Sequence, residues 1–171
     1  MAYYNLQVHS AYDLLNSTIK YKKSFEKLKS DNQDSVVIVD PNMYGAIKAY
    51  KEAKKTGTNL ISGLEVKLGY GISFLTFNIL CKNERMFHKL FELSTRFLNE
   101  EELSLEAFLA EMKDFKDDFV LIVTSELRDS IEFSYLHEQL VGYDFYFGFN
   151  EKFNYSIYTY YDNIVYTKPS Y

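Results

Sequence analysis

Two short runs of consecutive apolar residues constrain the fold of this chain more than any other feature of its sequence. Residues 35–39 read Ser-Val-Val-Ile-Val, and residues 119–123 read Phe-Val-Leu-Ile-Val. A strand in which nearly every side chain is apolar has to be covered on both faces, as strands of parallel sheets are in α/β proteins. The two runs therefore predict buried strands at the centre of an α/β fold.

Strands and helices are predicted to alternate along most of the chain. Further strands are expected at Tyr4–His9, Asn59–Leu64, Ile72–Leu80, Tyr143–Phe149 and Asn163–Tyr166. Helices are expected at Ile19–Leu28 after the capping residues Asn16, Ser17 and Thr18, at Met43–Lys54 with Gly57 as C-terminal cap, at Glu84–Leu98, at Leu105–Met112 and at Ile131–Leu140. This alternation predicts an α/β fold with a mostly parallel sheet.

Length, charge and cysteine content exclude several classes of protein. The 171 residues fit one domain, and a hydrophobic content of 47% allows a packed core. The net charge of −5 argues against strong nucleic-acid binding by this chain alone, because phosphate contacts require lysine and arginine. The single cysteine, Cys81, cannot form an internal disulfide and fits a reducing cytoplasm. No signal peptide and no apolar run of ~20 residues is visible, so we expect a cytoplasmic protein without membrane association.

Polar side chains stand where three predicted strands end. Gln7 and His9 occupy alternate positions at the end of the first strand, Asp40 follows the second strand, and Glu65 follows the strand that ends at Leu64. In parallel barrels the carboxyl ends of the strands carry the active site. Each residue also has a simpler interpretation: a histidine bonded to a backbone carbonyl, an aspartate that forms a turn, and a solvated glutamate. Their convergence favours a site, or the remains of one.

The residues around these strand ends form four motifs. The motifs lie at Leu6–Asn16, Val39–Ile47, Ile61–Val66 and Leu80–Glu84. In this order they resemble the PHP (polymerase and histidinol phosphatase) domain at the N-terminus of bacterial DNA polymerase III alpha subunits. The resemblance covers roughly the first hundred residues, and the ordered set of motifs is more specific than any one of them.

Several positions depart from the pattern of that family. The family opens with His-x-His, and this chain has Gln7 in place of the first histidine. Asn16 stands where the family has an aspartate, and Pro41 follows the aspartate of the second motif where the family has a histidine. Thr76 replaces a histidine of the next strand, and Thr167–Ser170 replaces an Asn-Asp-x-His run near the end.

These departures leave too few ligands for a metal-dependent phosphoesterase. Only His9 and Glu65 stand as ligands at matching positions, whereas glutamine and asparagine are weak neutral donors. A two-metal or three-metal site cannot be assembled from one histidine and one glutamate. We therefore expect no catalytic residues and no bound metal, and we interpret six positions as vestiges of the site: Gln7, His9, Asn16, Asp40, Glu65 and Thr76.

The resemblance implies a fold and a biological setting. The family's domain is a distorted seven-stranded (β/α) barrel, so we expect a partial or shortened barrel, with residues 1–171 forming one PHP-like domain at the N-terminus of a longer polymerase. The parent subunit copies DNA with Mg²⁺ bound in later domains, and this domain needs no cofactor of its own. Its implied partners are the remaining polymerase domains and a separate proofreading exonuclease. The alternative is an active metal-dependent phosphoesterase or 3′–5′ proofreading nuclease of the same family.

Four smaller predictions concern polar and aromatic groups. If no metal is bound, Asp40 or Glu65 should bond to backbone N–H groups, to a lysine or to hydroxyls such as those of Tyr12 and Tyr44, because a buried charge needs a partner. His9 should hydrogen-bond a neighbour in the same way. Lysines spaced along the helix after Pro41 are interpreted as a solvated face. In a longer chain the tyrosine-rich segment 155–171 should form a contact surface for the next domain. In this chain alone it should either form a dimer interface or rearrange to cover an open sheet edge.

Overall fold

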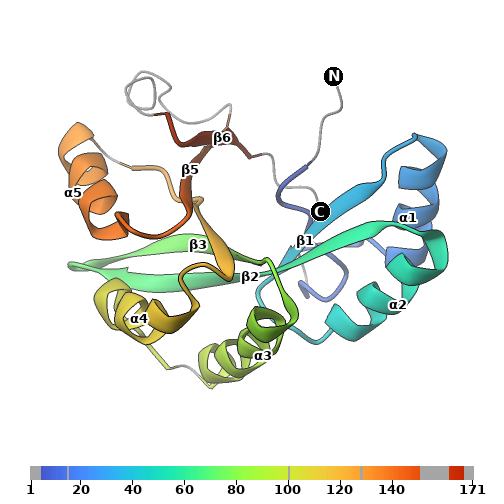
Figure 1. The fold of residues 1–171 in the computed structure, drawn as a ribbon, viewed down its shortest axis with the longest axis horizontal. Helices are drawn as coiled ribbons and strands as arrows, with labels where there is room; N and C mark the ends of the chain where they lie inside the picture. The colour runs from blue at the N-terminus through green and yellow to red at the C-terminus, as the bar shows by residue number, and fades with distance from the viewer. Residues whose placement is uncertain (1–4, 15, 100, 128, 151–161, 168–171) are drawn as a thin grey trace.

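The computed structural model describes residues 5–14, 16–99, 101–127, 129–150 and 162–167, and these form one curled sheet with helices around it (Figure 1). The strands are β1 (Ser35–Asp40), β2 (Asn59–Tyr70), β3 (Ser73–Cys81), β4 (Phe119–Val123), β5 (Phe145–Phe149) and β6 (Ile164–Tyr166). The helices are α1 (Tyr21–Ser30), α2 (Ala46–Thr56), α3 (Glu84–Leu98), α4 (Leu105–Glu111) and α5 (Ser130–Leu140), with a 3₁₀ turn at Met112–Phe115.

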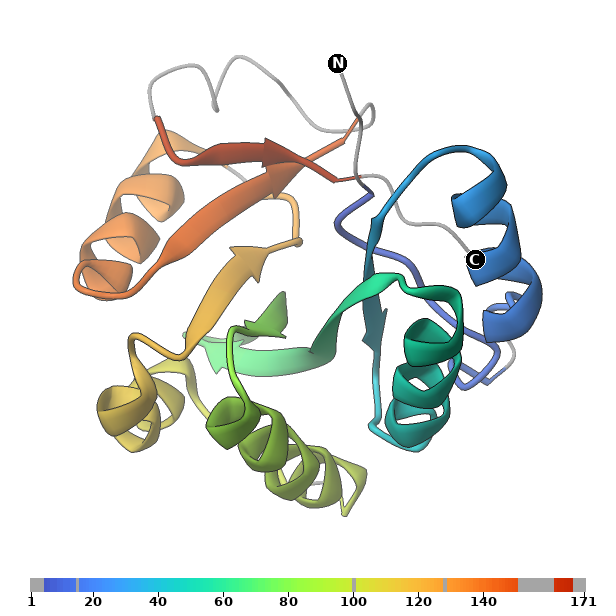
Figure 2. The same cartoon turned by 45° about the vertical axis from the view of Figure 1, so that its right-hand side comes forward.

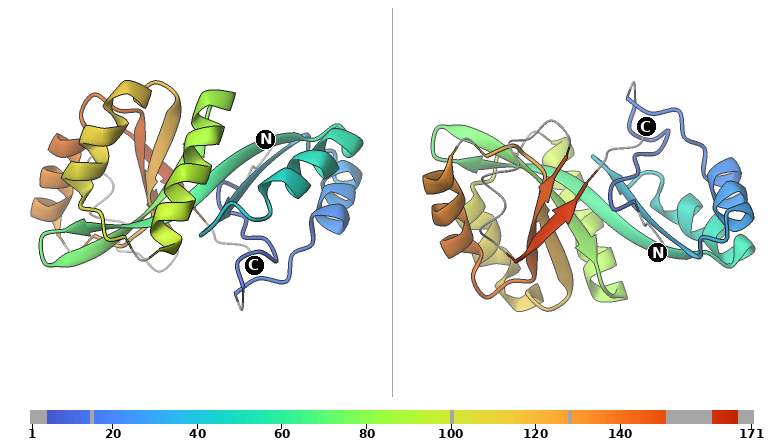
Figure 3. Two further views of the ribbon diagram at one scale, coloured as in Figure 1. Left: turned by 90° about the horizontal axis from the view of Figure 1, so that it is seen from below. Right: turned by 90° about the horizontal axis from the view of Figure 1, so that it is seen from above.

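The sheet has the strand order β1-β2-β3-β4-β5-β6 within the described residues, and it curls into a half-barrel with the helices on its outer side (Figures 2 and 3). Pairing is parallel between β1 and β2, between β4 and β5, and between β5 and β6. It is antiparallel on both sides of β3, because β2 and β3 are joined by a hairpin rather than by a helix. The predicted α/β partial barrel with a mostly parallel sheet is confirmed.

Both faces of the sheet are covered, as the apolar runs require. In β1, Val36 and Ile38 point outward into a cluster with α1 and α2, while Val37 and Val39 point inward. The largest cluster lies on the outer face of β2, β3, β4 and β5 beneath α3, α4 and α5, and Phe77 in it is fully buried. Burial of one such side chain stabilises the fold by ~1.5–3 kcal/mol. The described helices include none long and apolar enough to cross a membrane.

The predicted strand Tyr4–His9 is reduced to one parallel bridge between Val8 and Ile38. Val8 donates its N–H to the carbonyl of Val37 at 3.3 Å and accepts from the N–H of Val39 at 2.9 Å. Residues 1–4 lie outside the described part of the chain. The first strand was thus predicted too long, but its alignment along β1 is the one expected of a parallel neighbour.

The start of α1 corrects the capping prediction. The helix begins at Tyr21, and its N-cap Lys20 provides no side-chain bond. Ser17, which was predicted to cap the helix, instead donates its hydroxyl to the carbonyl of His9 at 2.7 Å. The hydroxyl is therefore used to fold the preceding loop, and the capping prediction was wrong.

Strand β2 is longer than predicted. It runs through Glu65 to Tyr70, because β3 continues to pair with it after β1 has ended at Asp40. Glu65 therefore lies within a strand rather than after one. Leu64, Val66 and Leu68 are buried on the outer face, so the intervening side chains point to the other face.

Helix α2 starts later than predicted and buries a different face. It begins at Ala46 and packs Ala49 and Ala53 inward, whereas Ile47 and Tyr50 are exposed. The predicted cap Gly57 is confirmed, with a φ of 71° that glycine adopts without steric cost. Of the tyrosine-rich segment 155–171, only residues 162–167 are described, and these contain β6. The rest of the predicted contact surface lies outside the described residues.

Candidate functional site

His9 lies at the centre of a polar cluster beside the end of β1. The Val8 bridge positions the segment, and the His9 side chain is almost fully buried. Its Nδ1 is 3.1 Å from Oδ2 of Asp13, and its Nε2 is 3.8 Å from Oε2 of Glu65. The amide nitrogen of Gln7 lies 3.4 Å from the same Nε2. Both ring nitrogens of His9 therefore face groups of the protein itself.

Asp40, the last residue of β1, is buried in an adjacent cluster. Its Oδ1 accepts from the N–H of Ser10 at 2.6 Å, and its Oδ2 accepts from the Ser10 hydroxyl at 2.5 Å and the Tyr21 hydroxyl at 3.4 Å. Burial raises the pKa of Asp40, because the cost of desolvating the carboxylate exceeds the effect of the two Ser10 bonds. Asp40 thus bonds to a backbone N–H and to hydroxyls, but these come from Ser10 and Tyr21 and not from the expected Tyr12 or Tyr44.

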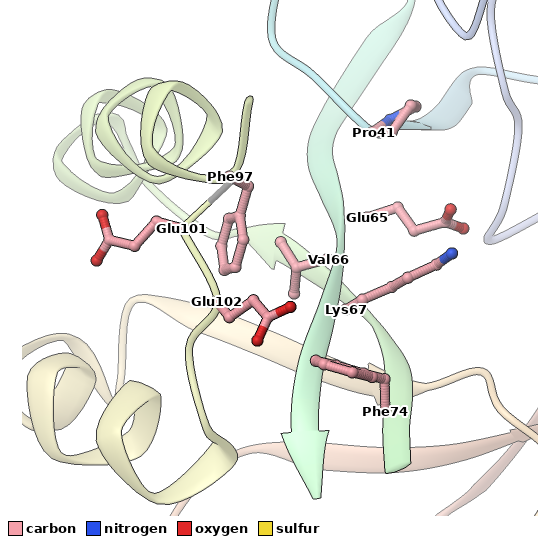
Figure 4. A pocket seen from close by; sticks show the side chains of 8 residues that line it. All are labelled: Pro41, Glu65, Val66, Lys67, Phe74, Phe97, Glu101 and Glu102. Carbon is pink, nitrogen blue, oxygen red and sulfur yellow. The ribbon is translucent and has the colours of Figure 1, made fainter. Parts of the chain in front are cut away.

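Glu65 stands between the buried cluster and a surface hollow. Figure 4 shows that Glu65 and Lys67 project to one side of β2, away from Val66 and Phe97. The hollow has a volume of about 500 Å³ and also borders Pro41 and two glutamates of the loop after α3. Burial raises the pKa of Glu65, and the nearby His9 offsets part of that rise.

The remaining predicted positions lie at increasing distance from His9. Asn16 is exposed, and its amide donates to Oδ1 of Asp13 at 2.9 Å, so it joins the cluster through that carboxylate. Thr76 pairs with Lys67 across β2 and β3, one step beyond Glu65. Its backbone N–H donates to the Ser125 hydroxyl at 2.7 Å. The structure therefore brings Gln7, His9 and Glu65 together, with Asn16 and Thr76 at the margins.

Two residues of the site were missed from the sequence. Asp13 is buried and contacts His9, but it lies in an irregular loop whose path no local pattern predicts. Asn78 is fully buried on β3 directly opposite Glu65, and neither atom of its amide has a hydrogen-bond partner among the described residues. A signal for Asn78 existed, since it interrupts the apolar run of β3. An unpaired buried amide costs about 1–3 kcal/mol.

The donor set does not fit the multinuclear metal centre that the resemblance implies. Within the described ranges, no group of three or more His, Cys, Asp and Glu side chains is arranged to hold a metal ion. Gln7 and Asn16 offer neutral amides, Pro41 offers no side-chain donor, and the carboxylate of Asp40 already accepts from Ser10. Residues 168–170, at the end of the chain, lie outside the described residues. The arrangement is suited to holding the N-terminal segment against β1 and β2.

Comparison with known proteins gives consistent matches. The family model for the PHP domain matches residues 5–161. DNA polymerase III subunit alpha of Staphylococcus aureus strain Mu50 is 29% identical over 139 residues, which span 78% of this chain and 13% of that protein. The corresponding subunit of Borreliella burgdorferi is 34% identical over 103 residues, which span 53% of this chain and 9% of that protein. The matched region is thus a small part of these relatives.

A solved structure supports the fold. The crystal structure of a proposed metal-dependent phosphoesterase from Bifidobacterium adolescentis superimposes with a TM-score of 0.66, covering 98% of this chain and 87% of that one. The two sequences are 11% identical, so the likeness concerns the fold alone. The family model, in contrast, matches most of the chain by sequence. The chain therefore belongs to the PHP domain family.

Proposed function

We propose that this chain is the N-terminal PHP domain of a replicative DNA polymerase III alpha subunit, with a structural or docking role and no hydrolytic activity of its own. The curated relatives support the first part, because they are such subunits. In this proposal DNA synthesis uses Mg²⁺ in other domains of a cytoplasmic polymerase. The partners of the chain are those domains and a separate proofreading exonuclease.

The orientation of the polar groups at the proposed vestigial site is the observation that best supports a lack of hydrolytic activity. A metal ligand must present a lone pair to the ion. Here His9 has one ring nitrogen toward Asp13 and the other toward Glu65, and Asp40 accepts from Ser10 and Tyr21. The groups that could bind cations are therefore turned toward one another, and their contacts join His9, Ser10 and Tyr21 to β1 and β2.

A second candidate function is that of a metal-dependent phosphoesterase or 3′–5′ proofreading nuclease. It is favoured by one specific feature, since Glu65 faces His9 and also borders the 500 Å³ hollow. This candidate requires ligands beyond His9 and Glu65, because hydrolysis needs both the attacking and the leaving oxygen to be stabilised.

Elemental analysis and a nuclease assay test the two candidates. We expect no stoichiometric zinc or manganese in the purified protein, and no trimming of a 5′-labelled DNA strand above background with Mn²⁺ or Zn²⁺. Glu102→Gln is the matched control for Glu65→Gln, because Glu102 borders the same hollow (Figure 4). Trimming that Glu65→Gln abolishes and Glu102→Gln preserves would establish the nuclease instead. The docking role is tested by co-elution of the chain with the remaining polymerase domains and with the exonuclease subunit.

A further inference from the structure

The outer layer of helices is interrupted between α2 and α3. Parallel strands β1 and β2 are connected through α2, and β4 and β5 are connected through α5. Between β2 and β3 the chain instead turns at Gly71, where a φ of 59° suits glycine, so no helix is contributed there. Helix α2 packs on α1 and β2, while α3 packs on β2 and β3, and the two helices stand apart on the outside of the sheet (Figure 2).

The interruption forms an apolar groove. Two hollows of about 480 and 450 Å³ meet at Ile47, which borders both. Their walls are formed by Tyr44, Ile47 and Tyr50 on the side of α2 and by Phe87, Phe91 and Leu98 on α3. We call these six residues the α2–α3 groove. The floor of one hollow includes Cys81 of β3.

The groove exposes large apolar side chains and has the length of a short helix. Tyr44, Ile47, Tyr50 and Leu98 have 68%, 50%, 56% and 44% of their surface exposed. Exposed apolar residues gathered in one groove mark contact surfaces in soluble proteins. From Phe87 to Leu98 the α3 wall extends for about 16 Å at ~1.5 Å per residue, which accommodates about three turns of a second helix.

The charges at the rim indicate the chemistry of the occupant. Lys51 and Lys54 follow Ile47 and Tyr50 by four residues each, so they extend the same face of α2. Neither lysine has an ion-pair partner in the described part of the chain, whereas Lys55 on the next face pairs with Glu52. On the opposite rim Glu84 faces His88 at 3.8 Å. A partner therefore matches the groove best with acidic residues over the α2 edge.

We infer that the α2–α3 groove binds an acidic amphipathic helix of a partner protein. Apolar residues at helical spacing fill the groove, and carboxylates on one edge lie over Lys51 and Lys54. The bound helix takes the place that a crossover helix between β2 and β3 would occupy in a regular barrel. This inference deepens the docking role proposed above and rests on it, but the groove lies on the opposite face of β2 from Glu65.

Synthetic helices of about 18 residues provide a direct test. One carries leucines at helical spacing and glutamates along one edge, a second has the same composition with the leucines scrambled, and a third has lysines on the edge. Fluorescence anisotropy measures binding, and alkylation of Cys81, the single cysteine, reports occupancy of the groove floor. We expect saturable binding of the first peptide alone, with alkylation of Cys81 slowed about tenfold near saturation.

Variants at exposed positions locate the contact. Ile47→Glu and Tyr50→Glu should abolish binding, and the double change Lys51→Glu with Lys54→Glu should weaken it roughly fivefold to tenfold. Ile131→Glu on α5, at a side chain that is 78% exposed, is the matched control and should bind like the wild type. Circular dichroism confirms that each variant is folded.

Several results would overturn the inference. The inference fails if the first peptide does not bind saturably, if the scrambled peptide binds equally well, or if the bound peptide leaves the rate of Cys81 alkylation unchanged. Competition by oligothymidylate would also overturn it and would indicate a nucleic-acid-binding surface instead. The nuclease and metal assays report on the other face of the sheet. If the protein binds the peptide and is also an active nuclease, only the proposed inactivity is refuted. If the protein is inactive and does not bind the peptide, only the inference about the α2–α3 groove is refuted.

Discussion

Replacement of Asp40 tests whether the polar contacts beside the end of β1 stabilise the fold. Asp40→Ala removes the acceptor of the Ser10 N–H and of the Ser10 hydroxyl, both inside the protein. Asp40→Asn keeps one acceptor oxygen and nearly the same volume. The two variants therefore distinguish loss of the hydrogen bonds from loss of the charge.

The magnitude follows from what each change leaves unpaired. The Ser10 hydroxyl keeps its hydrogen bond to the Tyr21 hydroxyl at 2.8 Å. The Ser10 N–H, in a residue with 0% exposure, has no acceptor other than Asp40 among the described residues. An orphaned buried donor costs about 1–3 kcal/mol, and the lost packing of the side chain adds to this. We expect Asp40→Ala to lower the free energy of unfolding by about 2–4 kcal/mol. Asp40→Asn should lower it by about 1 kcal/mol or less, because removal of a desolvated charge offsets the weaker bonds.

Urea unfolding at pH 7, followed by circular dichroism, measures both values, since the chain has no tryptophan. The sign of the pH dependence provides a second check. Because burial raises the pKa of Asp40, the folded state holds its proton more tightly than the unfolded state, so this group favours folding most in acid and less as the pH rises through its folded pKa. Equal stabilities of Asp40→Ala and the wild type would refute the reasoning and indicate that Ser10 reaches water.

Three further changes test neighbouring groups by the same unfolding measurement. Glu65→Gln should have the same free energy of unfolding as the wild type below pH 4 and a higher one at pH 8. Burial and the nearby Asp13 raise the pKa of Glu65, and His9 and Lys67 offset only part of that rise, so the charged form is disfavoured in the folded state. A variant less stable than the wild type at pH 8 would contradict this. His9→Ala should lower the free energy of unfolding by about 1–3 kcal/mol, because buried Asp13 loses its contact with the imidazole ring. Unchanged stability would mean that the cluster is solvated. Asn78→Leu should raise the free energy of unfolding by about 1–3 kcal/mol, because it removes a buried amide with no partner among the described residues. A loss of stability would reveal a partner such as a buried water molecule.

The parts of the fold that the sequence predicted are those set by local pattern. The bounds of β4 and α3 agree with the prediction, because the apolar run at Phe119–Val123 and the apolar side of Glu84–Leu98 leave few alternatives. Gly57 was also predictable, since a left-handed residue after a helix favours glycine. The end of β2 was not predictable from local pattern, because its extension to Tyr70 depends on pairing with β3 after β1 has ended.

Three members of the site were predictable, but Asp13, Asn78 and most of the contacts were not. Gln7, His9 and Glu65 come together as their positions at predicted strand ends implied, although Glu65 lies inside a strand. The partners of Asp40 required knowledge of a bridge at Val8, which brings Ser10 to the end of β1. Such contacts depend on tertiary placement of a loop, and no spacing rule within the sequence encodes them.

The sparse backbone pairing of the N-terminal segment gives the polar groups around His9 a structural role. The segment makes only a single described bridge to the sheet, at Val8. Leu6, Val8 and Tyr12 also pack against the apolar clusters beside β1. The segment makes polar contacts as well, among them His9 with Glu65, Ser10 with Asp40, and the Asn42 amide with the Tyr12 carbonyl at 2.9 Å. A regular strand would replace these contacts with a ladder of backbone bonds. The contacts of His9, Asp40 and Glu65 therefore help to hold the N-terminal segment against β1 and β2, independently of any hydrolytic chemistry.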